Sequence, residues 1–420
     1  MSEFNTVEKN IAGFLSKHPG MKRRIKKIYS ALNYLLNKKK YSFQTRLPIE
    51  KIVSDLTNES FFGYYDKSPL SPDRKHIIFH ETNGIVSHLP PDPKNNVNIM
   101  LYDIERSDYR KIAETTAYNW QQGSRLQWLD KDKFIFNCFE NGKYISKIYD
   151  NPGSSFRTIG FPIYDCFKNE FAVSLNFSRL NELDTHYGYK NITACDLSDV
   201  KNDGIFYTDL RTGESKLLLS LDEIVRMHSP DGSKEEDHCV NHIMISPDGR
   251  NFIFIHRWFC SGGRFDSLVM CDIDGKDPHI LANGGFVSHC CWNGNENIAG
   301  YLKAEAHRTA YYKININTLE TTLVSEKLKN FGDGHPSFFG NKMLFDSYPD
   351  RSRMQHLYIY DADTDGIEEI GSFLSALRFF GETRCDLHPR WAVGWEKIFI
   401  DSTHEGKRNL HKLDLNRKCV

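Results

Sequence analysis

One short structural unit recurs along most of this 420-residue chain and limits the folds that the chain can adopt. SPDR and SPDG turns, at residues 71–74 and 246–249, each separate two β-rich runs. Strand-like segments ending in an aromatic residue and Asp follow further on, and the whole unit returns at about 35–60 residues. Two strands around a tight turn, followed by further strands, make one blade of a β-propeller. We therefore predict an all-β, seven-bladed propeller over residues 58–420.

Seven such units can be counted in the sequence. They begin near Lys67, Arg125, Ile163, His242, His289, His335 and His388. The third unit is longer and carries an insertion around residues 181–202. We expect a strand near residues 61–65 to complete the last blade, because closing the ring removes exposed sheet edges. A pair of β-sandwiches is the alternative fold, and the regular spacing disfavours it.

The first 50 residues differ from the rest of the chain in charge and in pattern. They hold eleven Lys and Arg against three acidic residues, while the whole chain has a net charge of −1. Apolar residues at helical spacing predict a basic amphipathic helix from residue 8 to about 40. The stripe consists of Ile25, Ile28, Leu32, Leu35 and Leu36. We expect this arm to bind an anionic membrane surface or polysaccharide-assembly proteins through residues 9–46, or to dock on the acidic body of the protein itself.

Composition and missing motifs exclude several classes of protein. The near-zero net charge argues against binding nucleic acid through global charge. No apolar run of about 18 residues and no secretory signal are found. The ten cysteines include no CxxC, which indicates reduced thiols. We therefore expect a cytoplasmic protein, peripheral on the inner membrane face if the arm binds lipid. The sequence contains no phosphate-binding loop, dinucleotide fingerprint, nucleophile elbow or HExxH motif.

Aligning the units on their first strands brings chemically active side chains to one register. Most of these positions lie three residues before a bulky apolar residue, as His289 does before Trp292. The innermost strand of each blade runs along the central channel, so equivalent positions converge near the axis. The register contains His242, His289, His335, His388, Arg125 and Lys67. Residues that follow the second strands return to the same rim, because the strands are antiparallel. They include Arg179, Arg257, Tyr348 and His404.

Two chemistries fit this ring of side chains. Neutral imidazoles that face one point can bind a divalent metal, for which Mn, Zn and Ca are the candidates. Imidazolium and guanidinium groups can instead bind an anion such as a uronate. A purely structural use of the histidines is the third possibility. Nearby, Trp120 and Gln121 form either a sugar-stacking platform or a loop packed under the second blade.

Several multi-residue segments resemble one family of proteins. They are FFGYYDKSP, YNWQQGSRLQWL, SLNFSRL, NHIMISPDGRNFIFIHRW, VSHCCW, GDGHPSF, DSYPDR, RCDLHPRW and DSTHEGKR. Over about residues 58–415 the chain resembles the seven-bladed propellers that include rhamnose-glucuronate lyases and, more distantly, oligogalacturonate lyases. The resemblance implies a propeller that binds acidic, uronate-containing polysaccharide in its funnel and cleaves it by β-elimination.

A lyase acting beside a uronate needs a cation on the carboxylate, a base for the C5 proton and an acid for the leaving oxygen. We assign His242 as the preferred base and His289 as the second choice, with Tyr348 or His404 as the acid. The carboxylate would be neutralised by Arg125 and Arg179, or by a metal on His335 and His388. Further predicted substrate contacts are Lys67, Trp120, Gln121, Arg257 and Arg390.

A second hypothesis belongs to a different functional class. The propeller would then be a non-catalytic glycan-binding or scaffolding module in capsule or exopolysaccharide biosynthesis, located at the cytosolic membrane face. The basic arm favours this hypothesis, because degradation of a glycan needs no membrane anchor. Turnover of an acidic glycan would distinguish the two hypotheses.

Overall fold

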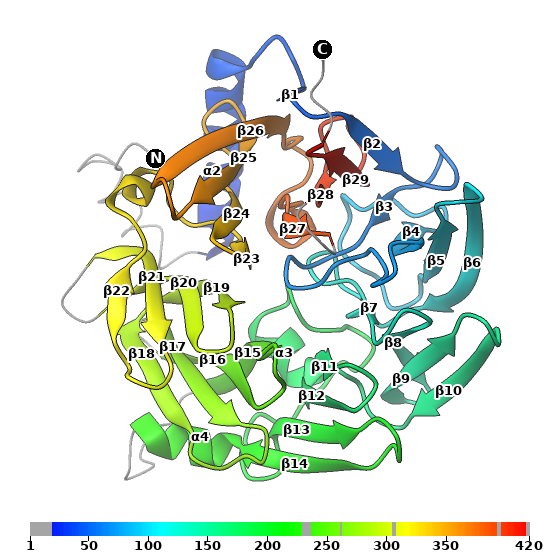
Figure 1. Cartoon of the computed structure of the whole chain (residues 1–420), viewed down its shortest axis with the longest axis vertical. Coiled ribbons are helices and arrows are strands. Elements are labelled where there is room, and N and C mark those ends of the chain that lie inside the picture. The colour runs from blue at the N-terminus through cyan, green and yellow to red at the C-terminus, as the bar shows by residue number, and fades with distance from the viewer. Residues whose placement is uncertain (1–18, 229–236, 261–262, 305–307, 393–395, 417–420) are drawn as a thin grey trace.

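Seven antiparallel sheets stand in a ring around a central axis (Figure 1). The computed structural model describes residues 19–228, 237–260, 263–304, 308–392 and 396–416. Each sheet is one blade, and its strands follow one another from the channel outward. The seven-bladed, all-β architecture predicted from the recurring unit is therefore confirmed.

The first four blades follow the chain from the channel to the outer edge. Blade one contains β3 (Ser60–Phe61), β4 (His76–Thr82), β5 (Val97–Asp103) and β6 (Asp108–Thr115). Blade two contains β7 (Gln127–Trp128), β8 (Lys133–Glu140), β9 (Lys143–Asp150) and β10 (Ser155–Ile159). Blade three contains β11 (Asp165–Phe167), β12 (Phe171–Leu175), β13 (Gly204–Asp209) and β14 (Ser215–Ser220). Blade four contains β15 (Asp237–Ile245), β16 (Asn251–Cys260), β17 (Gly263–Asp272) and β18 (His279–Gly285).

Blade five is built from four consecutive strands, whereas blades six and seven each gain a strand from the start of the chain. Blade five contains β19 (Val287–Asn293), β20 (Asn297–Lys303), β21 (Thr309–Asn315) and β22 (Thr321–Leu323). Blade six contains β23 (Ser337–Phe339), β24 (Lys342–Asp346), β25 (Met354–Asp361) and β26 (Gly366–Leu374), with β1 (Phe43–Thr45) outside them. Blade seven contains β27 (Arg390–Trp391), β28 (Lys397–Ser402) and β29 (Asn409–Asp414), with β2 (Ile49–Ile52) as its outer strand.

The strand that closes the ring is not the predicted one. β2 pairs antiparallel with β29, so residues near the start of the propeller complete the last blade. The expectation of a closing strand near residues 61–65 was wrong, because Phe61 belongs to β3, the innermost strand of blade one. The same segment therefore first closes blade seven and then crosses to the channel to begin blade one. Both β1 and β2 lie ahead of residue 58, where the sequence pattern places the start of the propeller.

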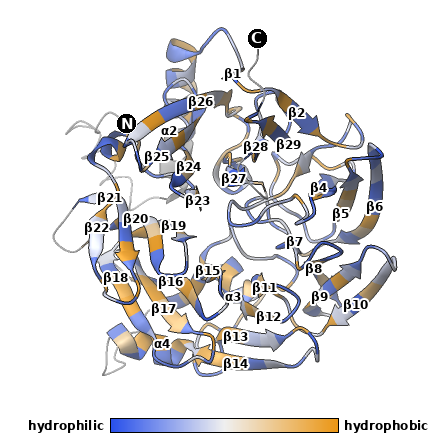
Figure 2. Cartoon of the chain, viewed as in Figure 1, coloured by the Kyte–Doolittle hydropathy of each residue, from blue (hydrophilic) through white to orange (hydrophobic). Residues whose placement is uncertain are grey.

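Many strands contain hydrophobic residues (Figure 2). Burial of these strands between neighbouring blades explains their composition. Six of the seven residues of β4 are buried, and so are Phe252 to Arg257 of β16. Both faces of such strands are covered, which favours continuous apolar runs over strict alternation. The turn between β15 and β16 matches the SPDG pattern: Ser246 Oγ donates to Asp248 and accepts from the amide of Asn251. Gly249 ends the turn with φ of 75°, a conformation that favours glycine.

Three α-helices and two 3₁₀ turns accompany the sheets in the described residues. α2 (Pro19–Asn37) precedes the propeller, α3 (Phe177–Leu183) lies in the insertion of blade three, and α4 (Leu221–His228) follows β14. The 3₁₀ turns are η1 (Glu326–Asn330) and η2 (Gly381–Thr383). α2 confirms the predicted N-terminal helix over its span, while residues 8–18 lie outside the described part. None of the described helices is both long and apolar enough to cross a membrane.

The closing strand generates a prediction about stability. Ile52 is fully buried between β29 and its neighbours, so Ile52→Ala should lower the free energy of unfolding by about 2–5 kcal/mol. Chemical denaturation followed by tryptophan fluorescence measures this change. Leu319→Ala, at an exposed position, is the matched control and should change the unfolding free energy by less than about 0.5 kcal/mol. Equal effects of the two substitutions would mean that β2 does not close the ring in solution.

Buried neutral histidines generate a prediction about pH. Burial lowers the pKa of His80 to about 3 and that of His411 to about 3. In the unfolded chain these groups bind protons near pH 6.5, whereas in the folded protein they do not until far lower pH. The free energy of unfolding should therefore fall as pH drops from 6.5 to 4, by up to about 1.4 kcal/mol per pH unit for each histidine.

The variant His80→Gln tests this origin of the pH dependence. Its unfolding free energy, measured by urea denaturation between pH 6.5 and 4, should fall less steeply than that of the wild type. An unchanged slope in His80→Gln would show that this histidine is protonated in the folded state.

Candidate active site in the funnel

The four histidines of the predicted register meet around one point of the channel. The ring centroids of His289 and His335 are 4.1 Å apart, and those of His335 and His388 are 4.3 Å apart. His242 lies 5.8 Å from His289 by the same measure. The ring of Tyr64 lies among all four imidazoles, at centroid distances of 5.0 to 6.4 Å. The convergence expected from the repeating unit is therefore present in the fold.

Irregular inner strands bring these histidines into the channel. The pairing of β15 with β16 shifts register between Asn241 and Met244, and the shift contains His242. The pairing of β19 with β20 shifts in the same way between Val287 and Cys290, and contains His289. A bulge bends its strand and redirects a side chain. Three residues of the register also adopt the uncommon left-handed conformation. They are Arg125 at φ 54°, His242 at φ 53° and His388 at φ 44°.

Tyr64 is the central residue that the sequence analysis did not select. Its Oη lies 3.0 Å from Nδ1 of His242. Arg390 holds the segment in place, because its Nη1 donates to the carbonyls of Gly63 and Tyr64 at 3.0 and 2.9 Å. Asp401 accepts the amides of the same segment and pairs with Arg390 at 2.9 Å. Arg390 was predicted to contact substrate, and the structure instead makes it a buried support for Tyr64.

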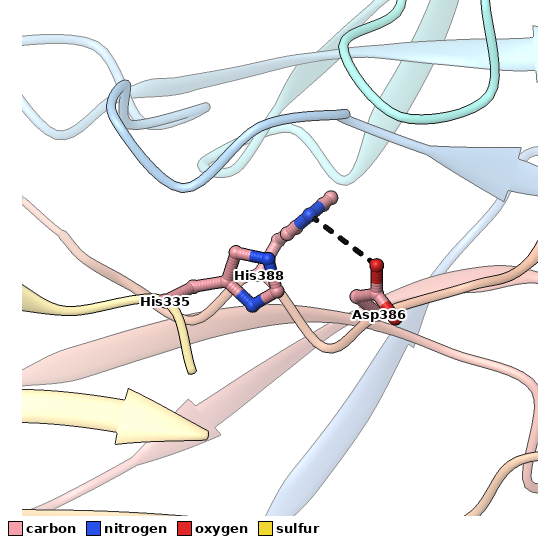
Figure 3. A group of neighbouring side chains, drawn as sticks. All are labelled: His335, Asp386 and His388. Atoms are coloured by element: carbon pink, nitrogen blue, oxygen red, sulfur yellow. Dashed lines mark ion pairs between the residues drawn. The ribbon is translucent and has the colours of Figure 1, made fainter. Parts of the chain in front are cut away.

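His335, Asp386 and His388 form a group with the donor atoms of a metal site (Figure 3). One ligand atom from each lies within 4.8 Å of the others, and all three residues are buried. His335 precedes β23, while Asp386 and His388 come from the segment before β27. The sequence analysis selected the two histidines but not Asp386, although it lies two residues before His388 in a quoted motif.

The hydrogen bonds of this group leave the inward-facing nitrogens available to a metal ion. Nδ1 of His335 donates to Asp346 at 2.9 Å, and Nδ1 of His388 donates to the carbonyl of Gly63 at 2.8 Å. Nε2 of each histidine is buried and has no hydrogen-bond partner among the residues that the structure describes. A histidine held at one nitrogen by a carboxylate or carbonyl commonly binds a metal through the other. The residues present therefore fit a divalent metal.

The two histidines differ in their affinity for protons. Burial, followed by the charge of His335, lowers the pKa of His388 well below its usual value. Burial also opposes a charge on His335, but the adjacent Asp346 carboxylate raises the pKa of this imidazole overall. His388 is therefore neutral near pH 7, whereas His335 must release its proton to bind a metal.

His289 has the geometry of an oriented base. Its Nδ1 lies 3.1 Å from Asp333 and 3.0 Å from Ser288 Oγ, which itself donates to Asp333 at 2.7 Å. Burial and the charge of His335 lower the pKa of His289, although Asp333 acts in the opposite direction. A neutral imidazole fixed through Nδ1 presents its other nitrogen for proton transfer. The sequence analysis did not select Asp333, although it lies two residues before His335 in the quoted GDGHPSF motif.

A cavity of about 370 Å³ opens beside these residues. His242, His289 and Asp333 line it together with Tyr187 and Tyr348. Three guanidinium groups also line it, those of Arg257, Arg264 and Arg384. The insertion of blade three supplies one wall through residues 183–187. The cavity therefore combines titratable side chains with cations that can bind an anionic ligand.

Each of these three arginines pairs with a carboxylate, and the exposed Arg264 does so with Asp266 at 3.3 Å. Arg257 is buried and contacts Asp184 and Asp266, each at 2.6 Å. Arg384 pairs with Asp386, and its Nη2 lies 3.3 Å from the hydroxyl of Tyr187. Arg257 was predicted as a substrate contact and does line the cavity. The sequence analysis did not select Arg264 or Arg384, because neither lies in the aligned register.

Two cations of the aligned register form ion pairs with carboxylates of the protein itself. Arg125 forms a two-point ion pair with Asp66 at 2.6 and 3.2 Å and donates to the carbonyl of Tyr164 at 2.7 Å. Lys67 pairs with Asp165. Neither residue lines the cavity. Their assignment as substrate contacts is corrected, since a buried charge is stabilised by such pairing.

Arg179 is likewise structural. Its guanidinium pairs with Asp203 and donates to four backbone carbonyls. These belong to Asp196, Leu197, Asp199 and His238. Arg179 thus ties the long insertion of blade three to the first strand of blade four. It does not line the cavity, and its predicted role in neutralising a carboxylate is corrected.

The WQQG segment is a packed loop and no platform for a sugar. Trp120 is 2% exposed, and its indole nitrogen donates to the carbonyl of Leu89 at 2.8 Å. Gln121 is fully buried and donates to the carbonyl of Arg384 at 2.8 Å. Of the two interpretations of this segment, the structure supports packing. Gln121 still bears on the site, because it positions the loop that carries Arg384.

His404 lies in a different cluster from the other predicted acid and bases. Its ring lies 4.7 Å from that of Phe43 and 4.6 Å from that of His411, and its Nδ1 is 2.9 Å from Ser402 Oγ. It does not line the cavity. Residues after β28 contact β1 at the outside of blade six, so His404 is removed from the candidate acids and Tyr348 remains.

Comparison with known proteins supports the fold. No protein-family model and no curated protein matches the sequence. An oligogalacturonate lyase solved in complex with manganese is similar in structure, with a TM-score of 0.62 and 14% identity over 90% of this chain and 98% of that one. The oligogalacturonate lyase of Vibrio parahaemolyticus gives a TM-score of 0.58 and 15% identity over the same shares. The predicted resemblance to lyase-type propellers is confirmed for the fold.

The metal-ligand group generates a prediction. Mn²⁺ should raise the melting temperature of the wild-type protein, because a ligand that binds only the folded state stabilises it by about 2.7 kcal/mol at 100 times its Kd. His388→Ala should abolish the shift, as measured by differential scanning fluorimetry with and without a chelator. His356→Ala removes a histidine that pairs with Glu369 and Asp350 outside the group, and should retain the shift. A full shift in His388→Ala would place the metal elsewhere.

Proposed function

We propose that the funnel binds a uronate-containing oligosaccharide and cleaves it by β-elimination. The observation that carries this proposal is the contact between two groups. Asp333 orients His289 as a candidate base. The ring of His289 lies 4.1 Å from that of His335, which belongs to the metal-ligand group. Elimination beside a carboxylate needs a base and an electron-withdrawing cation at adjacent positions of one sugar.

Cations at the carboxylate make the reaction possible. Binding the uronate carboxylate through positive charge stabilises the negative charge that develops when C5 loses its proton. A divalent metal held by His335, Asp386 and His388 would act there as a Lewis acid. Arg257, Arg264 and Arg384 are the candidates among side chains, since all three line the cavity. They take the role that the sequence analysis gave to Arg125 and Arg179.

His289 is the stronger candidate for the base, ahead of His242. The carboxylate of Asp333 orients His289 and stabilises the imidazolium that forms when the ring takes a proton. His242 faces the hydroxyl of Tyr64 and has no carboxylate among its hydrogen-bond partners in the described residues. The proton removed from C5 is transferred to His289, and the electron pair of that bond forms the C4–C5 double bond.

The leaving oxygen at C4 needs a proton, and Tyr348 is the candidate donor. Burial raises the pKa of Tyr348 well above its usual value, so the hydroxyl keeps its proton near pH 7. Its ring lies 5.9 Å from that of His335 and 5.9 Å from the guanidinium carbon of Arg384. The products are an unsaturated uronate and a shorter glycan with a new hydroxyl group.

Turnover tests the assignment of the base. Incubation with uronate-containing oligosaccharides should produce the ultraviolet absorbance of the unsaturated uronate. His289→Ala should lower kcat by about 10²–10⁴-fold, because a general base is lost, while KM changes much less. His356→Ala, outside the cavity, is the control and should retain the wild-type kcat. Full elimination activity in His289→Ala would overturn this assignment.

The alternative is a non-catalytic glycan-binding or scaffolding propeller. The exposed apolar face of α2 favours it, since a surface helix is more useful to an assembly factor than to a degradative enzyme. Under this alternative, acidic oligosaccharides bind by calorimetry, and no unsaturated product appears with or without Mn²⁺. Binding that His289→Ala leaves unchanged, in the absence of any turnover, would favour the scaffold over the lyase.

A further inference from the structure

α2 presents an apolar stripe to solvent. Ile28 is 60% exposed, Leu32 56%, Leu35 63% and Leu36 84%. These residues recur at a spacing of three to four, so they share one face of the helix. The expectation that this face docks on the acidic body of the protein does not hold for these four residues. A stripe of this kind on a soluble surface marks an interaction site.

The same stretch of the sequence is rich in basic residues. Lys22, Arg23, Arg24, Lys26 and Lys27 lie in the first half of α2, and Lys38 to Lys40 follow its end. Lys38, Lys39 and Lys40 are exposed, and no acidic residue occurs between Lys9 and Pro48. The partner that complements both features is apolar and anionic at once. A bilayer with anionic headgroups has this combination.

The helix contacts the loop that forms part of the funnel. The Lys27 ammonium lies 5.8 Å from the centre of the Phe380 ring. Phe380 belongs to the segment between β26 and β27, which also carries Arg384 of the cavity and Asp386 and His388 of the metal-ligand group. A surface bound to α2 would therefore lie on the side of the propeller from which this loop enters the channel.

We propose that α2 binds an anionic membrane and lies in the plane of its surface. The side of the propeller from which the loop of Phe380 and Arg384 enters the channel then lies beside the membrane. The helix has 19 residues and is not apolar enough to span a bilayer, so it lies along the interface with its stripe inserted between the headgroups. Lys38 to Lys40 contact the lipid phosphates. This proposal does not depend on the chemistry of the funnel, since it concerns only where the protein is located.

Vesicle binding by the full-length protein is the experiment. Vesicles of phosphatidylcholine with 30% or so phosphatidylglycerol should sediment the protein, and pure phosphatidylcholine should bind it far more weakly. Replacing Lys38, Lys39 and Lys40 with Gln should weaken binding to the anionic vesicles on the order of 100-fold, at roughly fivefold for each lysine. Leu35→Glu should weaken it at least about tenfold, because one inserted apolar side chain is lost.

Matched variants on the propeller control for surface chemistry. Leu319→Glu places the same substitution at another exposed leucine, and replacing Lys94, Lys131 and Lys143 with Gln removes three exposed lysines elsewhere. Both controls should bind anionic vesicles like the wild type. Circular dichroism should show the same strand content for every variant, so that loss of binding cannot be assigned to unfolding.

Two results would overturn the proposal. One is wild-type affinity of Leu35→Glu for anionic vesicles, which would mean that the stripe does not insert. The other is a wild-type protein that does not bind vesicles and forms a dimer in analytical ultracentrifugation, which Leu35→Glu converts to a monomer. The apolar stripe of α2 would then contact a second copy of the chain. Neither result bears on elimination activity, so the two proposals can fail separately.

Discussion

The pairing of β2 with β29 joins the two ends of the propeller, and the geometry of the funnel depends on it. The last blade reaches four strands because β2, from the start of the chain, pairs with β29, the last strand of the chain. Directly after this strand the chain crosses to the channel and delivers Tyr64 to its centre. Closure of the ring and placement of the central residue are therefore consequences of one short segment.

Burial of charge shapes the walls of the funnel. Arg125, Arg257 and Arg390 are nearly fully buried, and each pairs with a carboxylate. An unpaired ion at such depth would cost several kcal/mol, so every cation near the axis has a structural partner. Ion pairing therefore affects these cations differently. Arg257 and Arg384 are held by carboxylates and still line the cavity, whereas the pairing of Arg125 and Lys67 occupies them away from it.

His289 and Tyr348 line the cavity, and the rings of both lie near that of His335, so a candidate base and a candidate acid adjoin a candidate metal ligand. The structural similarity to oligogalacturonate lyases supports this only through the shared fold, at 14–15% identity. The chemistry of the site rests on its own hydrogen bonds. Chief among them are the carboxylate contacts of His289 and His335, which orient the two rings. Burial and the charge of His335 lower the pKa of His289, whereas Asp346 raises that of His335 against the effect of burial.

The sequence by itself determined the repeating unit, the number of blades and the register that brings four histidines together. These follow from local patterns, since turns and apolar strands are formed by residues that are near neighbours in the chain. It did not determine the ion pairs of Arg125 and Arg179, the packing of Trp120 or the separate position of His404. Nor did it indicate Tyr64, Asp386 or Arg384 as members of the site. Those features depend on contacts between blades, which only the closed ring creates. A side chain's partner across the channel is set by rotation about the axis and by side-chain direction, and neither is encoded in the spacing of residues along a strand.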